Sequence, residues 1–271
     1  MRVHPGRALV VACLVLGGCR SDGGETADTD ADADTDTDTD TDTDTDTDTD
    51  TDTDTDTDTD TDGNSTGIVR FLALGDAGQG NEDQYALGQA MVQVCADRTD
   101  EQPGCDFAIY LGDNFYEDGV DSVDDEQFQT KFELPYADLD LPFYAALGNH
   151  DYGGDGPGTD WDRPDPQVAY GDVSDKWVMD DRYYQHDHGH ASFFVLDTHA
   201  ILWDSVWSGA EDQQAWLQQG LTDSSKLWRI AYGHHPYLSN GQHGIAGSYG
   251  GVEDVPVTSG EELQSFVEAA V

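Results

Sequence analysis

Four apolar runs along this chain each end in a glycine, and a side chain able to bind a metal ion follows each glycine. The runs span residues 68–74, 107–111, 143–147 and 230–232, and each has the length and composition of a buried strand. In open α/β sheets, ligands bind beyond the carboxyl ends of the strands, where glycine lets the backbone turn sharply. The sequence therefore predicts an α/β fold in which the four glycine motifs meet at one edge.

The motifs combine hard oxygen donors with imidazoles. In chain order they are Gly75-Asp76-Ala77-Gly78, Gly112-Asp113-Asn114-Phe115-Tyr116, Gly148-Asn149-His150-Asp151, Gly233-His234-His235-Pro236 and a fifth, Gln242-His243-Gly244. Such donors suit iron, zinc or manganese, and two such ions about 3.5–4 Å apart can clamp a phosphate. A single Gly-Asp or Gly-Asn pair is also typical of an ordinary turn. The ordered set favours a two-metal site that cleaves phosphoesters.

Residues 68–271 resemble the metallophosphoesterases, and most closely the small purple acid phosphatases of the tartrate-resistant type. The resemblance is carried by the second motif followed by Gly119-Val120, because Tyr116 separates purple acid phosphatases from most other metallophosphoesterases. It implies a four-layer α/β sandwich, with two mixed sheets face to face and helices outside. It also implies an acid phosphatase that hydrolyses a small phosphomonoester by attack of a metal-bound hydroxide.

The same resemblance implies a set of metal ligands, which in chain order are Asp76, Asp113, Tyr116, Asn149 and His234. Asp76 would bind the first ion, and Asp113 would bridge both ions. Asn149 and His234 would bind the second ion. A phenolate from Tyr116 favours Fe(III) in the first position, while Fe, Zn and Mn all suit the second.

Two further histidines are implied to be catalytic. His150 and His243 would line the substrate phosphate and assist protonation of the leaving group. The family closes its site with a Gly-His-x-His motif, and none follows His243, although Ser259 and Glu262 form a capping-box pattern for one more helix. We therefore expect this sequence to be a fragment or a truncated gene product, in which each metal lacks one imidazole.

Two other functions stay open at this point. One is a phosphodiesterase or nucleotidase on the same scaffold, because the sequence does not define the leaving group. The other is a non-catalytic surface lipoprotein, if the Gly-His-x-His motif is truly absent.

The first 18 residues have the pattern of a secretory signal. Arg2 and Arg7 precede an apolar core over residues 8–16, which is too short for a membrane span. The following Leu16-Gly17-Gly18-Cys19 resembles a bacterial lipobox. It implies a lipidated Cys19 and an exported, membrane-anchored protein of the bacterial envelope or cell surface. The alternative is an ordinary signal peptide with an incidental cysteine.

Residues 19–67 are predicted to form a disordered tether. From Thr35 to Asp62 the chain is an unbroken Thr-Asp repeat, which has no apolar side chains to bury and a dense negative charge. A calcium-binding or glycosylated stalk is the alternative, although nothing in the repeat defines ligand geometry as a dedicated calcium loop does.

The remaining domain, residues 68–271, is strongly acidic. Residues 63–271 hold 8 Lys and Arg against 37 Asp and Glu, a net charge of −29. Nucleic-acid binding requires a basic footprint, so this composition argues against a nucleic-acid partner. The same charge repels polyanionic substrates at long range, unless the bound metals locally reverse its sign.

Patterning predicts further elements around the motifs. Helices are expected over residues 81–95, 124–132 and 211–221, a long loop over 152–181, and a hairpin over 183–198. The buried helix faces are predicted to include Leu87, Met91 and Val94 in the first helix and Ala215, Trp216 and Leu217 in the third. The hairpin turn is predicted to hold His186, His188 and His190. Cys95 and Cys105 are spaced for a disulfide in an exported protein, with two free buried thiols as the alternative.

Overall fold

The computed structural model describes residues 8–11, 68–96, 104–154, 158–203, 209–236 and 260–270, with the backbone alone for residues 8–11, 260–262 and 264. The Thr-Asp repeat, Cys19, His243 and Ser259 lie outside the described residues. None of the helices in the described part has the length and apolar character that a membrane span requires.

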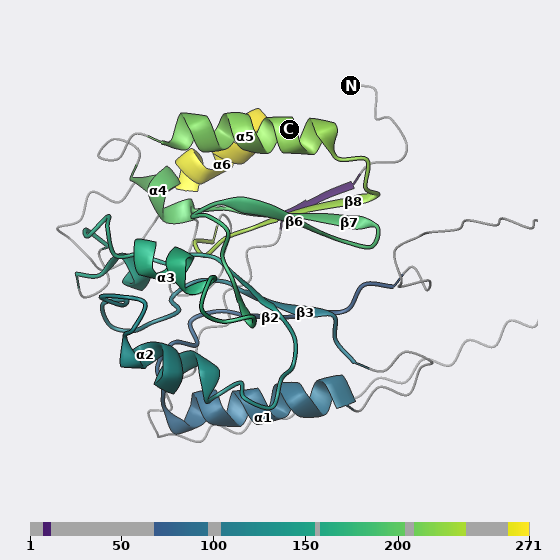
Figure 1. The fold of residues 1–271 in the computed structure, drawn as a ribbon. Coiled ribbons are helices and arrows are strands. Elements are labelled where there is room, and N and C mark those ends of the chain that lie inside the picture. Colours follow the sequence, from purple (N-terminus) through teal and green to yellow (C-terminus); the bar gives the residue numbers. More distant parts are fainter. Residues whose placement is uncertain are drawn as a thin grey trace, which may run out of the picture. The chain divides into compact units, whose positions relative to one another are not determined.

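One sheet carries three of the glycine motifs (Figure 1). Its strands, in spatial order, are β2 (Phe71–Leu74), β3 (Phe107–Tyr110), β4 (Phe143–Ala145) and β5 (Trp177–Val178). All neighbouring pairs are parallel. Because parallel strands end on the same side, the motifs that follow β2, β3 and β4 emerge together at the carboxyl edge.

The second sheet carries the fourth motif. Its spatial order is β1 (Ala8–Val11), β8 (Trp228–Tyr232), β7 (Ala191–Val195) and β6 (Tyr184–His188). β1 and β7 are both parallel to β8, and β6 is antiparallel to β7. β1 lies within the segment predicted to be a signal. The predicted α/β sandwich is confirmed, but the first sheet is wholly parallel among the described strands and only the second is mixed.

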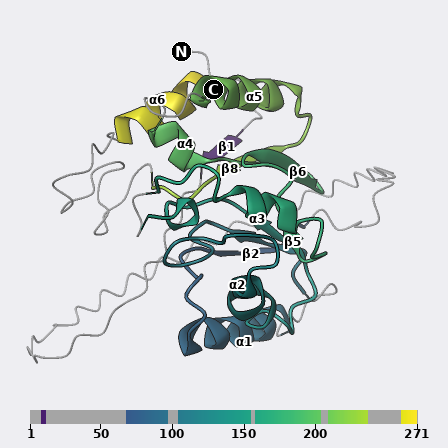
Figure 2. The ribbon, with the colours of Figure 1, turned by 60° about the vertical axis from the view of Figure 1, so that its left-hand side comes forward.

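Helices cover the outer faces of both sheets (Figure 1, Figure 2). Against the first sheet lie α1 (Glu82–Ala96), the short α2 (Glu126–Phe128) and its continuation η1 (Gln129–Glu133). Against the second lie α4 (Thr198–Leu202), α5 (Ala210–Asp223) and α6 (Gly260–Ala270). The long helices lie over the faces of the sheets, so they do not cover the edge at which the glycine motifs emerge.

Aromatic side chains fill the space between the sheets. Phe107 is fully buried, stacks on Phe71 at 5.2 Å between ring centroids, and meets Phe193 edge-on at 5.2 Å. A second apolar cluster, which includes Phe194, Leu217 and Leu263, packs the mixed sheet against α5 and α6. Because aromatic pairs prefer edge-to-face and offset-stacked geometries, these contacts favour one packing arrangement of the two sheets.

The buried face of α1 differs from the predicted one. Met91 is buried as expected, but Leu87 is 39% exposed and Val94 is 50% exposed. The face turned inward centres on Gly88, where a Cβ would lie only 2.0 Å from the carbonyl oxygen of Pro135. Close packing at a glycine, rather than the apolar stripe, orients this helix.

Two other predictions need correction. In α5, Leu217 is buried and Trp216 is half-buried, but Ala215 faces solvent. The predicted loop over residues 152–181 contains a helix, α3 (Asp165–Tyr170), as well as β5. α3 is held by burial of Gln167 and Tyr170, a pattern too short to show helical periodicity.

The predicted hairpin is present, but its histidines are not all in the turn. His186 and His188 lie on β6. The ring of His186 stacks on Tyr144 at 3.7 Å, and the ring of His188 stacks on Phe107 at 3.9 Å. These two imidazoles therefore pack between the sheets.

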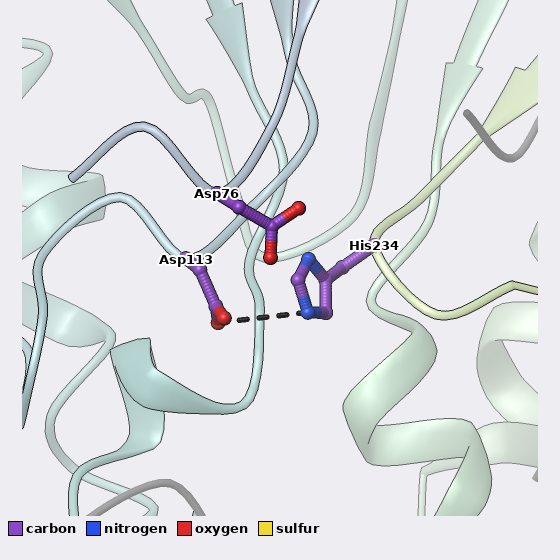
Figure 3. A group of neighbouring side chains, drawn as sticks. All are labelled: Asp76, Asp113 and His234. Atoms are coloured by element: carbon purple, nitrogen blue, oxygen red, sulfur yellow. Dashed lines mark ion pairs between the residues drawn. The ribbon is translucent and has the colours of Figure 1, made fainter. Parts of the chain in front are cut away.

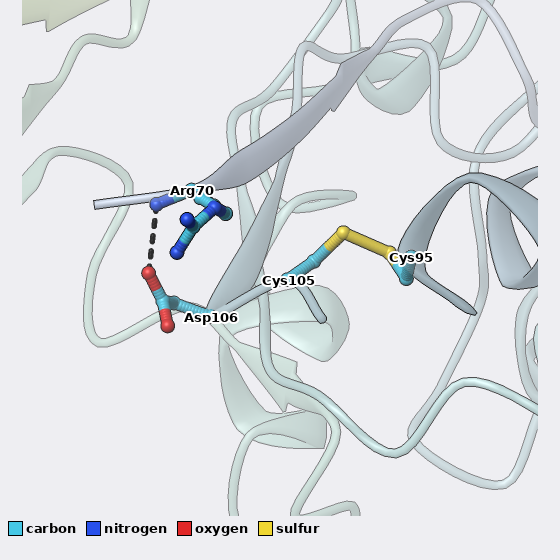
Figure 4. Close-up of a disulfide and its surroundings, with 4 residues drawn as sticks. All are labelled: Arg70, Cys95, Cys105 and Asp106. Atoms are coloured by element: carbon cyan, nitrogen blue, oxygen red, sulfur yellow. Dashed lines mark hydrogen bonds between the residues drawn. A yellow bond between two sulfur atoms is a disulfide. The ribbon is translucent and has the colours of Figure 1, made fainter. Parts of the chain in front are cut away.

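The predicted disulfide is formed (Figure 4). It joins Cys95, at the end of α1, to Cys105, just before β3, with 5.3 Å between the Cα atoms. Beside it, the backbone N–H of Arg70 donates to the Asp106 carboxylate at 2.7 Å. The cross-link ties the helix to the strand that carries the second motif.

Candidate metal centre

The aspartates after β2 and β3 sit in unusual backbone conformations. Asp76 has φ 55° and Asp113 has φ 53°, a left-handed region that non-glycine residues seldom adopt. The neighbouring Gly148 makes a close approach possible, because a Cβ there would lie 2.3 Å from both the N and the Oδ1 of Asp113. Strained backbone at converging loops marks candidate functional sites.

Side chains from three motifs meet at this edge (Figure 3). Potential ligand atoms of Asp76, Asp113 and His234 all lie within 4.8 Å of one another. His234 Nε2 is 3.6 Å from Asp113 Oδ1 and 3.1 Å from Asn149 Oδ1. The Nδ1 of His234 donates to the Leu111 carbonyl at 2.9 Å, which directs Nε2 toward the carboxylates.

Tyr116 closes the same cluster. Its hydroxyl donates to Asp113 Oδ2 at 2.8 Å and to Asp76 Oδ1 at 3.0 Å. All five residues predicted to be metal ligands are thus brought together: Asp76, Asp113, Tyr116, Asn149 and His234.

The electrostatics of the cluster suit a cation. Burial, reinforced by the carboxylates of Asp113 and Asp76, raises the pKa of Tyr116 well above its ordinary value. Burial alone lowers the pKa of His234, but the same two carboxylates outweigh it and raise the pKa. The carboxylates of Asp113 and Asp76 thus create a negative potential at both groups, which a bound metal cation would compensate. The donor set, two carboxylates with a phenol, an amide and an imidazole, fits iron, zinc or manganese.

A buried carboxylate organises the loops beneath the cluster. Asp151 is fully buried and accepts the backbone N–H of Asn114 at 2.9 Å and that of Gly148 at 2.8 Å. It also accepts the side-chain amide of Gln167, from α3, at 3.0 Å. Burial and the neighbouring Asp113 raise the pKa of Asp151 to about 7. Asp151 therefore fastens the second motif to the third.

These supporting residues had little or no signal in the sequence. Asp151 belongs to a motif, but nothing in the motif shows that it accepts bonds from the neighbouring loop. Gln167 lies in the segment predicted to be a loop, and no local pattern marks it.

His150 lies beside the cluster. Its backbone N–H donates to Asp113 Oδ1 at 2.9 Å, and its Nδ1 donates to the carbonyl of Glu117 at 2.7 Å. Its ring packs on Tyr116 with 4.4 Å between centroids. The other histidine predicted to be catalytic, His243, is outside the described residues.

His235, which follows His234, points elsewhere. It is buried, its Nδ1 is 2.8 Å from the Thr198 hydroxyl, and its backbone N–H donates to the same oxygen at 3.1 Å. Asp197 caps α4 by accepting the N–H of Ala200 at 3.0 Å. These residues hold the fourth motif against α4.

A two-sheet α/β sandwich with a potential metal-binding group at its carboxyl edge is typical of the metallophosphoesterases. Residues 69–256 match the model of the calcineurin-like phosphoesterases, the Metallophos family, and the chain belongs to that family. The resemblance inferred from the second motif is confirmed.

The relatives found by comparison are acid phosphatases. The chain is 30% identical to purple acid phosphatase 4 of Arabidopsis thaliana over 202 residues, which cover 67% of this chain and 56% of that protein. It is 28% identical to tartrate-resistant acid phosphatase type 5 of Homo sapiens over 202 residues, which cover 66% of this chain and 60% of the relative. The chain thus spans somewhat more than half the length of these relatives.

Proposed function

We propose that this chain hydrolyses small phosphomonoesters with the help of two metal ions held by the strand-end motifs. The observation that carries the proposal is the meeting of Asp76, Asp113 and His234 within 4.8 Å at the carboxyl edge. The acid phosphatase relatives support the reaction class.

Each ligand has a proposed place. Asp76 and Tyr116 would hold a first ion, which we propose to be Fe(III), and Asn149 and His234 would hold a second ion, Fe, Zn or Mn. Asp113 would reach both ions, because its two oxygens face different partners: Oδ2 accepts from Tyr116, and Oδ1 lies toward His234. When bound, such ions polarise a phosphate and lower the pKa of water.

His150 is proposed to act on the substrate. Because its Nδ1–H donates to the Glu117 carbonyl at 2.7 Å, Nε2 is the nitrogen left to meet a phosphate or a leaving oxygen. Nε2 can donate a proton to either only when the ring is an imidazolium, with both nitrogens protonated. We propose that His243 shares this role. Replacing either histidine by alanine is expected to keep the bound metal and to lower kcat by roughly 10²–10⁴-fold.

The test of the reaction class is a pair of chromogenic esters. The metal-loaded protein is expected to hydrolyse p-nitrophenyl phosphate with a higher kcat/KM than bis(p-nitrophenyl) phosphate. A preference for the diester would make the chain a phosphodiesterase on the same scaffold. Hydrolysis of neither ester, with metal bound, would reject the proposal.

We also propose that the protein is exported and anchored through a lipidated Cys19, with no nucleic-acid partner. The Cys95–Cys105 disulfide supports an oxidising compartment. Labelling with a fatty acid in a bacterial host tests the anchor: wild type should be labelled, and Cys19→Ser should not. Equal labelling of both would refute it.

A further inference from the structure

Glu117 is the exposed acidic side chain beside the metal centre. It follows the ligand Tyr116 directly, and its side chain is 65% exposed while that of His150 is 18% exposed. Its carboxylate lies 3.9 Å from His150 Nδ1, and its backbone carbonyl accepts from the same nitrogen. A substrate that reaches Nε2 of His150 therefore comes within about one Debye length, ~10 Å at 0.1 M salt, of this carboxylate.

Two described cations on neighbouring segments, Arg163 and Lys131, have partners of their own. Arg163 contacts Asp121 at 2.9 Å and Asp160 at 3.5 Å. Lys131 directs its ammonium to the carbonyl of Tyr116 and to the side-chain oxygen of Gln127. The charge of Arg163 is therefore compensated by two carboxylates, whereas the ammonium of Lys131 interacts with the carboxylate of Glu117 and offsets part of its charge.

We propose that Glu117 sets the charge preference of the site. On the proposed function, on which this inference rests, the metal centre compensates the charge of the phosphate that is cleaved. A leaving group that contacts Nε2 of His150 would then lie near the Glu117 carboxylate, which is 3.9 Å from Nδ1 of the same ring. The site therefore prefers phosphomonoesters whose leaving group is neutral or cationic, and it disfavours those whose leaving group carries further phosphates.

The test compares three substrates that differ in leaving-group charge: choline phosphate, p-nitrophenyl phosphate and pyrophosphate. Each substrate is compared with itself across variants, so that intrinsic reactivity cancels. Relative to p-nitrophenyl phosphate, kcat/KM for pyrophosphate should rise roughly 3-fold in Glu117→Gln and roughly 10-fold in Glu117→Lys, as expected for one and two units of charge several ångströms away in water. For choline phosphate the relative value should fall. Both changes should shrink at 0.5 M salt.

Glu211→Lys is the matched control. Glu211 is exposed on α5, in the opposite helical layer, and the substitution changes the net charge by the same amount. It should leave the relative values within 2-fold. If Glu211→Lys shifts the preference as much as Glu117→Lys does, net charge and not Glu117 sets it, and the proposal is wrong.

A binding measurement distinguishes failure of this proposal from failure of the proposed function. Turnover of none of the three substrates would reject the phosphatase assignment. The charge preference is then tested by calorimetric titration of the metal-loaded protein with orthophosphate and tripolyphosphate. Glu117→Lys should lower the Kd for tripolyphosphate at least 3-fold more than the Kd for orthophosphate. An equal change in both constants overturns the proposal.

Discussion

At the scale of single residues, the proposed role of Tyr116 as an iron ligand gives the most specific prediction. Its phenol donates to two carboxylates in the described structure, and an Fe(III) ion bound there would replace that proton. The iron-loaded wild type should then show a visible phenolate-to-iron charge-transfer band. Tyr116→Phe should abolish the band and keep the far-UV circular dichroism of the wild type. A colourless iron-loaded wild type would exclude Tyr116 as a ligand.

Asp151 is fully buried beneath the proposed ligands. It accepts backbone N–H groups from the loops that carry Asp113 and Asn149, so its loss should loosen both. Groups that orient metal ligands typically contribute 10–100-fold to metal affinity. Asp151→Ala should therefore weaken metal binding, measured by competition with a chelator, roughly 10–100-fold.

The control for Asp151 is Gln167→Ala, which removes one of its donors and keeps the three backbone donors, Asn114, Phe115 and Gly148. It should weaken metal binding less than Asp151→Ala does. Wild-type metal affinity in a folded Asp151→Ala protein would refute the positioning role.

At the scale of elements, strand β6 carries an acid-sensitive pair. Burial is the main cause that lowers the pKa of His186 to about 3, and the nearby His188 is the second cause. Burial also lowers the pKa of His188. Among the described residues, the Nδ1 of His186 and the Nε2 of His188 have no hydrogen-bond partner. Protonation would therefore place two charges between the sheets.

The sign of the pH dependence follows from the lowered pKa. The unfolded chain takes up a proton on His186 near pH 6.5 and the folded chain only near pH 3. The stabilisation is complete above pH 6.5 and is lost as pH falls toward 3, with a slope of up to about 1.4 kcal/mol per pH unit for this group.

Urea unfolding at pH 7.5, 6, 5 and 4 measures this dependence. His186→Phe keeps a ring to stack on Tyr144 and cannot titrate, so its free energy of unfolding should decline less than that of wild type. Identical slopes for the two proteins would contradict the assignment.

The elements also show what a single sequence can predict. The four strands, both long helices around the motifs and the hairpin follow from apolar runs and caps, which are local. The buried face of α1 depends on Gly88 meeting the carbonyl of Pro135, a contact between segments far apart in the chain. α3 has six residues, too few for a periodic pattern. His186 and His188 look like turn residues until the register of β6 places their rings on Tyr144 and Phe107.

The residues of the candidate site also fall into a group that the sequence could predict and a group that it could not. Four of its residues could be placed at the site because they follow strands closely, and parallel strands end at one edge: Asp76, Asp113, Asn149 and His234. Tyr116 lies further from its strand and was assigned from the family resemblance. Asp151, Gln167 and Glu117 instead contact residues on other loops. Their hydrogen bonds and distances depend on tertiary structure, which no spacing in the sequence reveals.

At the scale of the whole molecule, two sheets bring four segments of the chain to one edge. Three motifs come from the parallel sheet and one from the mixed sheet, so the candidate metal centre takes residues from both sheets. Metal binding to such a site should stabilise the folded state, because the unfolded chain has no preformed site.

The metal content of Asp113→Asn tests this account most directly, because Asp113 is the residue proposed to reach both ions. After loading with excess metal and removal of the unbound ions, elemental analysis should find two ions per chain in the wild type. Asp113→Asn should hold one or none and should lose phosphatase activity with them. If a folded Asp113→Asn protein retains the full metal complement of wild type, the strand-end motifs do not form the proposed metal centre.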